Sequence, residues 1–133
     1  HGEALRLYGE ALGISFQIVD DFLDYTGNKS NLGKNIGDDF REKKITLPII
    51  YSLQKKNNTN YLFWKRTLEK GHQKIEDFEI AQKVLIDDGS LDKTRLDAIY
   101  WSNIAKSQLK FLPESQFNKL LVKLTDYVVA RVS

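Results

Sequence analysis

The sequence predicts an all-α protein, a helical bundle. Apolar residues recur at three- and four-residue steps along several segments, as on one face of a helix. No segment alternates strictly between apolar and polar residues, and none carries a hairpin signal such as Asn-Gly between β-branched runs. At 133 residues the chain has the length of one ordinary domain, so we expect a single domain over residues 1–133.

The expected helices are separated by glycine, proline and polar breaks. The first is expected from Gly2 to about Tyr25, ending near Gly27, and residues 28–38 are expected to form a loop because Gly and Asn are concentrated there. Later helices are expected over Leu47 to Leu53, Tyr61 to Leu68, Ile75 to Ile86, Leu91 to Leu112 and Ser115 to Val132. Thr46 with Pro48 fits a helix start, and Asp39 with Glu42 fits an earlier one as a capping box; the sequence leaves both open.

The composition excludes several functional classes. With 20 basic and 18 acidic side chains the net charge is only +2, which gives no global field to attract nucleic acid or an anionic membrane, so any anion site must be local. Cysteine is absent, which excludes a disulfide framework and a thiolate metal site and fits a reducing compartment. A signal peptide and a long apolar run are also absent, so we expect a cytoplasmic protein without a membrane span.

Four polar residues near the end of the first expected helix share one side of it. At about 100° per residue they fall within an arc of about 100°, and the neighbouring apolar residues lie opposite; the four are Gln17, Asp20, Asp21 and Asp24. The three carboxylates repel one another, so a cation should compensate them. Oxygen ligands without His or Cys suit Mg²⁺, which usually bridges from one or two carboxylates to a substrate phosphate. The alternative is a solvated polar face.

The segment that follows combines glycines with basic residues: Gly33, Lys34, Gly37, Arg41, Lys43 and Lys44. Glycines let backbone N–H groups approach an anion, and lysines act as point charges on phosphate oxygens. The P-loop pattern Gly-x-x-x-x-Gly-Lys-Ser/Thr is missing. Next to the aspartates we interpret the segment as a phosphate clamp; a solvated surface loop is the alternative.

Three strings in this order resemble the second aspartate-rich region of trans-polyprenyl diphosphate synthases: Phe16 to Tyr25, Leu32 to Asp39, and Lys44 to Pro48. The ending from Asp126 to Arg131 resembles the last helix of the octaprenyl and decaprenyl synthases that make the ubiquinone side chain. Lys43 departs from the family, which usually has a glycine there. The family's first aspartate-rich motif would lie upstream, and the chain has no methionine even at position 1, so we expect the C-terminal part of an isoprenoid synthase fold.

The resemblance implies a Mg²⁺-dependent prenyltransferase that condenses isopentenyl diphosphate with an allylic diphosphate of the farnesyl or geranyl type, acting as a homodimer. It implies that Asp20, Asp21 and Asp24 are metal ligands. Asp20, Asp21 and Lys34 would be catalytic, while Gln17, Lys34 and Lys44 would contact the substrate. The chain alone is expected to be inactive, because its aspartates supply only one side of a metal cluster.

Two other functions compete with this prediction. One is a non-catalytic partner subunit or interaction module, against which the intact Asp20, Asp21, Asp24 and Lys34 count. The other is a class I terpene cyclase, whose second motif combines Asn or Asp, Ser or Thr, and a terminal Glu, a form that Phe16 to Asp24 lacks. Outside the motif, Trp64 is expected to be a core or interface anchor, and Asp87 with Asp88 only polar surface.

Overall fold

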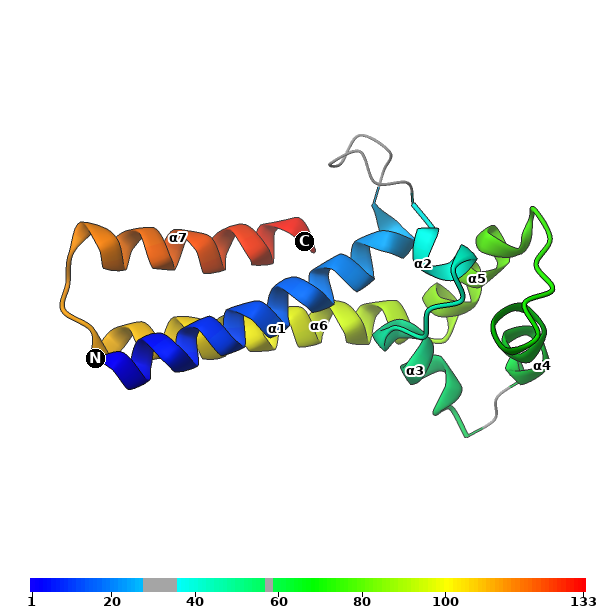
Figure 1. The fold of residues 1–133 in the computed structure, drawn as a ribbon, viewed down its shortest axis with the longest axis horizontal. Helices are drawn as coiled ribbons and strands as arrows, with labels where there is room; N and C mark the ends of the chain where they lie inside the picture. The colour runs from blue at the N-terminus through cyan, green and yellow to red at the C-terminus, as the bar shows by residue number, and fades with distance from the viewer. Residues whose placement is uncertain (28–35, 57–58) are drawn as a thin grey trace. The chain divides into compact units, whose positions relative to one another are not determined.

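A computed structural model describes residues 1–27, 36–56 and 59–133 of the chain. These ranges contain helices and no strand, which confirms the all-α prediction. The α-helices are α1 (Gly2–Thr26), α2 (Asp38–Arg41), α3 (Leu47–Leu53), α4 (Tyr61–Trp64), α5 (Asp77–Asp87), α6 (Ser90–Gln108) and α7 (Gln116–Arg131), with a π-helical segment η1 (Lys65–Glu69) and a 3-10 segment η2 (Leu109–Phe111) (Figure 1). In the described ranges no helix is both long enough and apolar enough to pass through a membrane.

The chain divides into two compact units. Unit 1 comprises His1–Asp20 and Arg95–Ser133, and unit 2 comprises Asp21–Thr94. The boundaries fall within α1 and within α6, so both helices contribute to both units.

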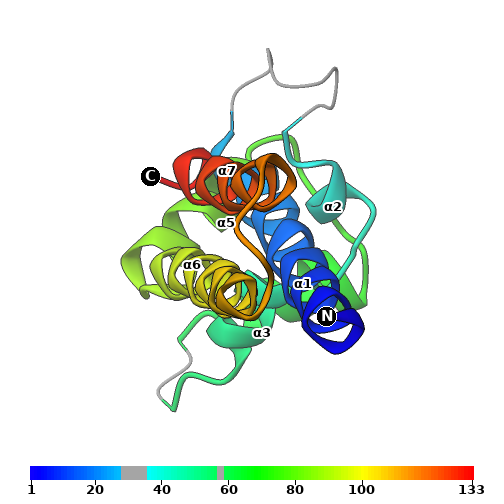
Figure 2. The ribbon, with the colours of Figure 1, turned by 90° about the vertical axis from the view of Figure 1, so that its left-hand side faces the viewer.

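Unit 1 is built from three helices: α1 up to Asp20, α6 from Arg95, and α7, which lie side by side in both ribbon views (Figures 1 and 2). Small residues allow the helices to approach closely, and the fully buried ones include Ser15, Ala98, Ser102 and Ala105. Three buried hydroxyls donate to main-chain carbonyls of another helix: Tyr8 Oη to Leu121 O (2.7 Å), Ser15 Oγ to Ala98 O (2.6 Å) and Ser102 Oγ to Thr125 O (3.0 Å). Buried polar groups are therefore used here to link the helices.

The last helix begins where the sequence predicts. Ser115 is the N-cap of α7, and its Oγ accepts a hydrogen bond from Asn118 N at 3.0 Å. The helix expected from Leu91 to Leu112 is α-helical to Gln108 and then tightens into η2.

Unit 2 has an apolar core rich in aromatic residues: Tyr25, Phe40, Ile49, Trp64, Leu68, Ala81, Leu85 and Leu91. Trp64 is 2% exposed, which confirms its place in the core, and its Nε1 donates to Ser52 Oγ at 2.9 Å. Ser52 Oγ in turn donates to Asp88 Oδ2 at 2.7 Å, and Asp88 Oδ1 accepts from Ser90 N at 2.9 Å. The prediction that Asp88 is only polar surface is wrong, because this carboxylate ties α3 to the start of α6.

The segment after residue 60 differs from the single helix that was predicted. It begins as α4 but continues from Lys65 as a π-helix, in which Lys70 N donates to Lys65 O at 2.9 Å. Thr67 Oγ1 donates to Phe63 O at 2.8 Å, so a side chain bonds a carbonyl of the preceding turn.

α5 begins at Asp77, two residues after the predicted start at Ile75, which is fully exposed. The Asp77 carboxylate accepts from Lys74 N at 2.7 Å and from both terminal nitrogens of Arg66, at 2.8 and 3.0 Å. The hydrogen bonds from Arg66 are the main reason that the pKa of Asp77 lies below its usual range.

Both possible starts before α3 exist as separate short helices. Thr46 is the N-cap of α3, with Pro48 in the first turn, but its side chain makes no capping hydrogen bond. The N-cap of α2 is Gly37, so the capping box predicted for Asp39 and Glu42 is wrong.

Candidate functional site

The C-terminal end of α1, which carries two of the predicted metal ligands, is fixed through its last carbonyls. Four of them accept hydrogen bonds: Phe22 O from Thr26 Oγ1 (2.9 Å), Leu23 O from Gly27 N (2.7 Å), Asp24 O from Gly37 N (2.9 Å) and Tyr25 O from Gln82 Nε2 (2.8 Å). The terminal carbonyls of a helix lack partners within the helix, so such bonds decide how firmly its end is held. Three of the four donors lie outside α1: Gly27 directly follows the helix, Gly37 precedes α2, and Gln82 lies on α5.

Asp21 and Asp24 are buried in unit 2. Their exposed fractions are 9% and 3%, and Asp24 Oδ2 accepts a hydrogen bond from Asp39 N at 3.1 Å. A carboxylate is rarely buried unless it has hydrogen bonds or ionic partners. The solvated-face alternative is therefore excluded for these two residues.

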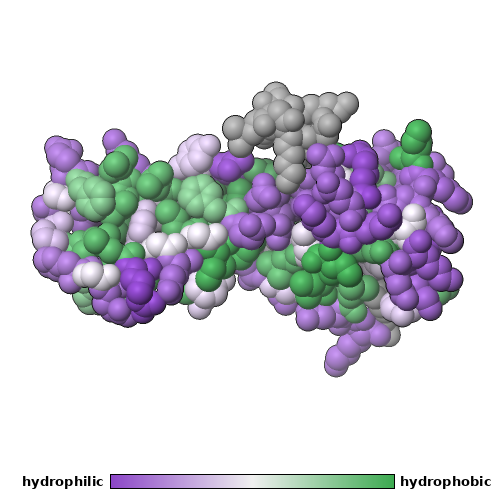
Figure 3. Space-filling model, viewed as in Figure 1, coloured by the Kyte–Doolittle hydropathy of each residue, from purple (hydrophilic) through white to green (hydrophobic). Residues whose placement is uncertain are grey.

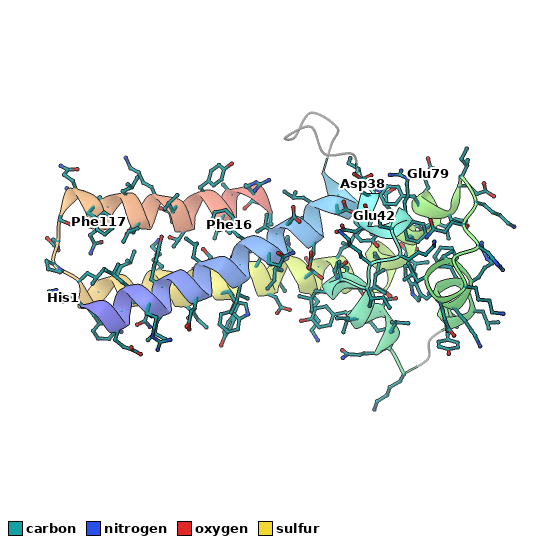
Figure 4. All side chains as sticks on the ribbon, in the orientation of Figure 1. His1, Phe16, Asp38, Glu42, Glu79 and Phe117 are labelled. Atoms are coloured by element: carbon teal, nitrogen blue, oxygen red, sulfur yellow. The ribbon has the colours of Figure 1, made fainter. Side chains whose placement is uncertain are left out.

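Asp39 also contacts Lys44, which is a predicted phosphate ligand. Asp39 is 5% exposed, and its Oδ1 lies 3.8 Å from Lys44 Nζ, while Lys44 N donates to Asp39 O at 2.9 Å. The Lys44 side chain is 59% exposed, and its Nζ also lies 3.2 Å from Glu42 Oε2. Figure 4 labels Glu42 and the nearby Asp38. Asp24, Asp39 and Lys44 thus form a connected polar group, and the ammonium can still reach a solvent-borne anion.

Two residues with positive φ flank α2. Gly37 has φ +89°, and a Cβ there would lie 2.8 Å from the Phe78 ring, so only glycine fits where its N–H meets Asp24. Lys43 has φ +61°, the left-handed conformation that glycine adopts easily. The departure from the family at Lys43 therefore changes the residue type and keeps the backbone conformation that suits a glycine.

Tyr25 also belongs to this region, although the sequence predicts for it only an apolar position on the first helix. Its ring stacks on Phe78 at 5.8 Å between centroids, it is 1% exposed, and its hydroxyl has no hydrogen-bond partner in the described ranges. Burial raises the pKa of the hydroxyl strongly, and the charges of Asp24, Asp39 and Asp21 raise it further. The hydroxyl therefore stays protonated, as a donor beside carboxylates.

Asp20 directly precedes Asp21 on α1, but it differs from the two buried aspartates in its exposure. Gln17 and Asp20 are exposed on the part of α1 that belongs to unit 1. Lys34 and Gly33 lie outside the described residues. Gln82 was missed because it lies 57 positions from Tyr25 and no local pattern announces the contact.

The carboxylate oxygens of Asp21 and Asp24 are ligands that suit a hard divalent cation. The described residues hold no group of three or more His, Cys, Asp or Glu side chains arranged to bind a metal ion by themselves. Mg²⁺ usually keeps several waters and takes one or two carboxylates plus substrate phosphates, and Asp21 and Asp24 offer carboxylates of that kind on one helix.

The chain belongs to the polyprenyl synthetase family, whose sequence pattern matches residues 1–85. It is 34% identical to the octaprenyl diphosphate synthase of Haemophilus influenzae over 129 residues, which cover 97% of this chain and 39% of that protein. Its structure is similar to the decaprenyl diphosphate synthase of Rhodobacter capsulatus, with a TM-score of 0.89 and 47% identity over 98% of this chain and 40% of that one.

A third relative is the polyprenyl synthase of Caulobacter crescentus, solved in complex with calcium and isoprenyl diphosphate. The similarity has a TM-score of 0.90 and 40% identity, and covers 98% of this chain and 40% of the other. The chain thus spans about two fifths of the length of these relatives, and it matches the C-terminal part of their fold.

Proposed function

We propose that this chain is the C-terminal part of a Mg²⁺-dependent trans-polyprenyl diphosphate synthase that makes a long-chain product for the ubiquinone side chain. The observation that carries the proposal is the buried pair Asp21 and Asp24 at the anchored end of α1, joined to Lys44 through Asp39. Octaprenyl and decaprenyl synthases among the relatives support a long-chain product. We propose in addition that the protein acts as a homodimer in the cytoplasm.

The reaction breaks the bond between C1 of the allylic substrate and its diphosphate oxygen, and the electron pair leaves with the diphosphate. C4 of isopentenyl diphosphate forms the new carbon–carbon bond, and a proton is lost from its C2. Negative charge grows on the leaving oxygens, so groups fixed in advance around them lower the barrier. When bound, Mg²⁺ supplies Lewis-acid neutralisation of that charge.

The residues of this chain would prepare the place for the diphosphate. Asp20, Asp21 and Asp24 would hold the cation, and Gln17 would add a hydrogen bond to the substrate. The N–H of Asp39 already fixes the Asp24 carboxylate, which removes the need to order it during the reaction. Lys34 and Lys44 would contact the phosphate oxygens.

The proposal is tested by a chimera in which this chain replaces the matching 40% of the Rhodobacter capsulatus decaprenyl synthase. With farnesyl diphosphate, Mg²⁺ and labelled isopentenyl diphosphate, the chimera should make extended product. The 133-residue chain alone should make none, because the upstream part supplies the other side of the metal cluster. Extended product from the chain alone, or a folded chimera without product, would contradict the proposal.

Lys34→Ala and Lys44→Ala in the chimera separate binding from folding. Lys44 is exposed, and Lys34 belongs to a glycine-rich stretch of the sequence. Surface substitutions usually change stability by less than about 0.5 kcal/mol, so we expect an unchanged melting temperature and a higher KM for both variants. A large drop in melting temperature with unchanged kinetics would remove both lysines from the site.

A further inference from the structure

Positive charge is concentrated in one segment of unit 2. Residues 41–74 contain nine Lys and Arg and two acidic residues, a net charge of +7, whereas the whole chain carries +2. The rest of the chain therefore has a net charge of −5. Three of these cations are paired with carboxylates just outside the segment: Arg41 with Asp38, Lys44 with Asp39 and Arg66 with Asp77. The nearly balanced total still conceals a basic segment, and the cations outside these pairs give a local field that attracts anionic surfaces.

The same segment exposes apolar side chains. Leu62 is 75% exposed, Ile45 56%, Tyr61 50% and Leu53 36%. Three of these residues, Ile45, Leu53 and Tyr61, line one hollow together with Trp64, Leu68, Lys65 and Glu69. In Figure 3 apolar surface over α3 is surrounded by hydrophilic side chains. Ile45, Leu53, Tyr61 and Lys65 thus line one apolar and basic hollow, and exposed residues follow two of them in the sequence, Lys55 and Lys56 after Leu53 and Leu62 after Tyr61. We name this region the α3–α4 face and define it as Ile45, Leu53, Lys55, Lys56, Tyr61, Leu62 and Lys65.

We propose that the α3–α4 face rests on the surface of an anionic lipid bilayer. Apolar and aromatic side chains that enter the headgroup region, ringed by lysines that pair with lipid phosphates, are the features of an interfacial site. The long stems of the lysines let their ammonium groups stay at the headgroups while their carbons cover apolar surface.

Charge complementarity favours a bilayer over another protein. Within this segment the acidic residues are only Glu42 and Glu69, so a second copy of the same face would meet it with like charge. If the proposed function holds, the product is an amphiphile whose polyprenyl tail partitions into a bilayer, so an enzyme bound to a bilayer would release its product close to its destination.

The test is co-sedimentation of the 133-residue chain with vesicles, without Mg²⁺ or substrate. Vesicles of phosphatidylcholine with an equal share of phosphatidylglycerol should bind the chain at low salt, and pure phosphatidylcholine should not. Lys55→Gln with Lys56→Gln should weaken binding roughly fivefold per lysine, because each basic residue near an anionic membrane contributes about that factor. Leu62→Gln should weaken it as well.

Matched controls come from α7 in unit 1. Lys119→Gln with Lys123→Gln removes the same charge from exposed positions, and Leu120→Gln removes a leucine that is 54% exposed; both should leave binding unchanged. The proposal is overturned if mixed vesicles bind no protein or if the two double variants lose binding equally. It is also overturned if Leu62→Gln abolishes a dimer in sedimentation velocity while vesicles bind nothing. Since the assay contains no substrate, these outcomes leave the chimera experiment untouched.

Discussion

Gln82→Met should loosen the end of α1 that carries the buried aspartates. The amide of Gln82 is the donor, at 2.8 Å, to the carbonyl of Tyr25, a residue that is 1% exposed. Methionine has a similar length and no donor, so the change leaves little cavity but strands a buried acceptor, which costs about 1–3 kcal/mol.

Two measurements follow this change. Urea denaturation should show the loss of stability, and amide hydrogen exchange should become faster at Gly27 and Gly37, whose N–H groups bond to the neighbouring carbonyls of Leu23 and Asp24. Tyr8→Phe in unit 1 is the matched control, because it removes a buried bond of 2.7 Å to a main-chain carbonyl far along the chain. Tyr8→Phe should leave the rate of amide hydrogen exchange at Gly27 and Gly37 unchanged. A loss below about 0.5 kcal/mol in Gln82→Met with unchanged exchange would refute the reasoning.

Three further predictions concern stability and are measured by denaturation. The pKa of Asp77 is lowered in the folded state by its hydrogen bonds with Arg66. The pair therefore stabilises the fold above the unfolded pKa of about 3.9, and this contribution is lost as the pH falls through the folded value. Arg66→Met should lower the stability at neutral pH and have much less effect in strong acid, where Asp77 is protonated. An equal cost at both pH values would contradict this. Ser52→Ala should cost about 2 kcal/mol because it strands Trp64 Nε1, and a neutral effect would be inconsistent with that bond. At φ +61° Lys43→Gly should be more stable than Lys43→Ala by about 1 kcal/mol, and the reverse order would exclude the left-handed conformation.

The sequence predicts most helices because their signals are local. The apolar period of α1 and the capping serine of α7 are carried by neighbouring residues, and both helices begin and end close to the predicted positions. Local signals of this kind do not predict the late start of α5 or the role of Asp88. They depend on hydrogen bonds with Arg66 and Ser52, 11 and 36 positions away, which no window of neighbouring residues contains.

The sequence predicts which residues belong to the candidate site better than it predicts their burial and their hydrogen bonds. The helical period predicts that Asp21 and Asp24 share one side of α1. The environment of Asp24 depends in addition on the return of the chain at Gly37, which directs Asp39 N at the Asp24 carboxylate. The spacing from Asp39 to Glu42 fits a capping box and predicts a helix cap, whereas the N–H of Asp39 fixes Asp24 in the structure. Long-range packing decides between the two roles.

The central claim is that the carboxylates of α1 act on a diphosphate through a divalent cation. The most direct measurement is kcat for Asp20→Asn in the chimera at saturating Mg²⁺, beside Asp126→Asn, an exposed aspartate of α7 paired with Lys106. Removal of one preorganised electrostatic group commonly lowers kcat by about 10² to 10³. Asp20→Asn should therefore lower kcat by about 10² to 10³, and Asp126→Asn should leave kcat unchanged. Turnover of Asp20→Asn within about threefold of the parent chimera, far from that range, would contradict the claim.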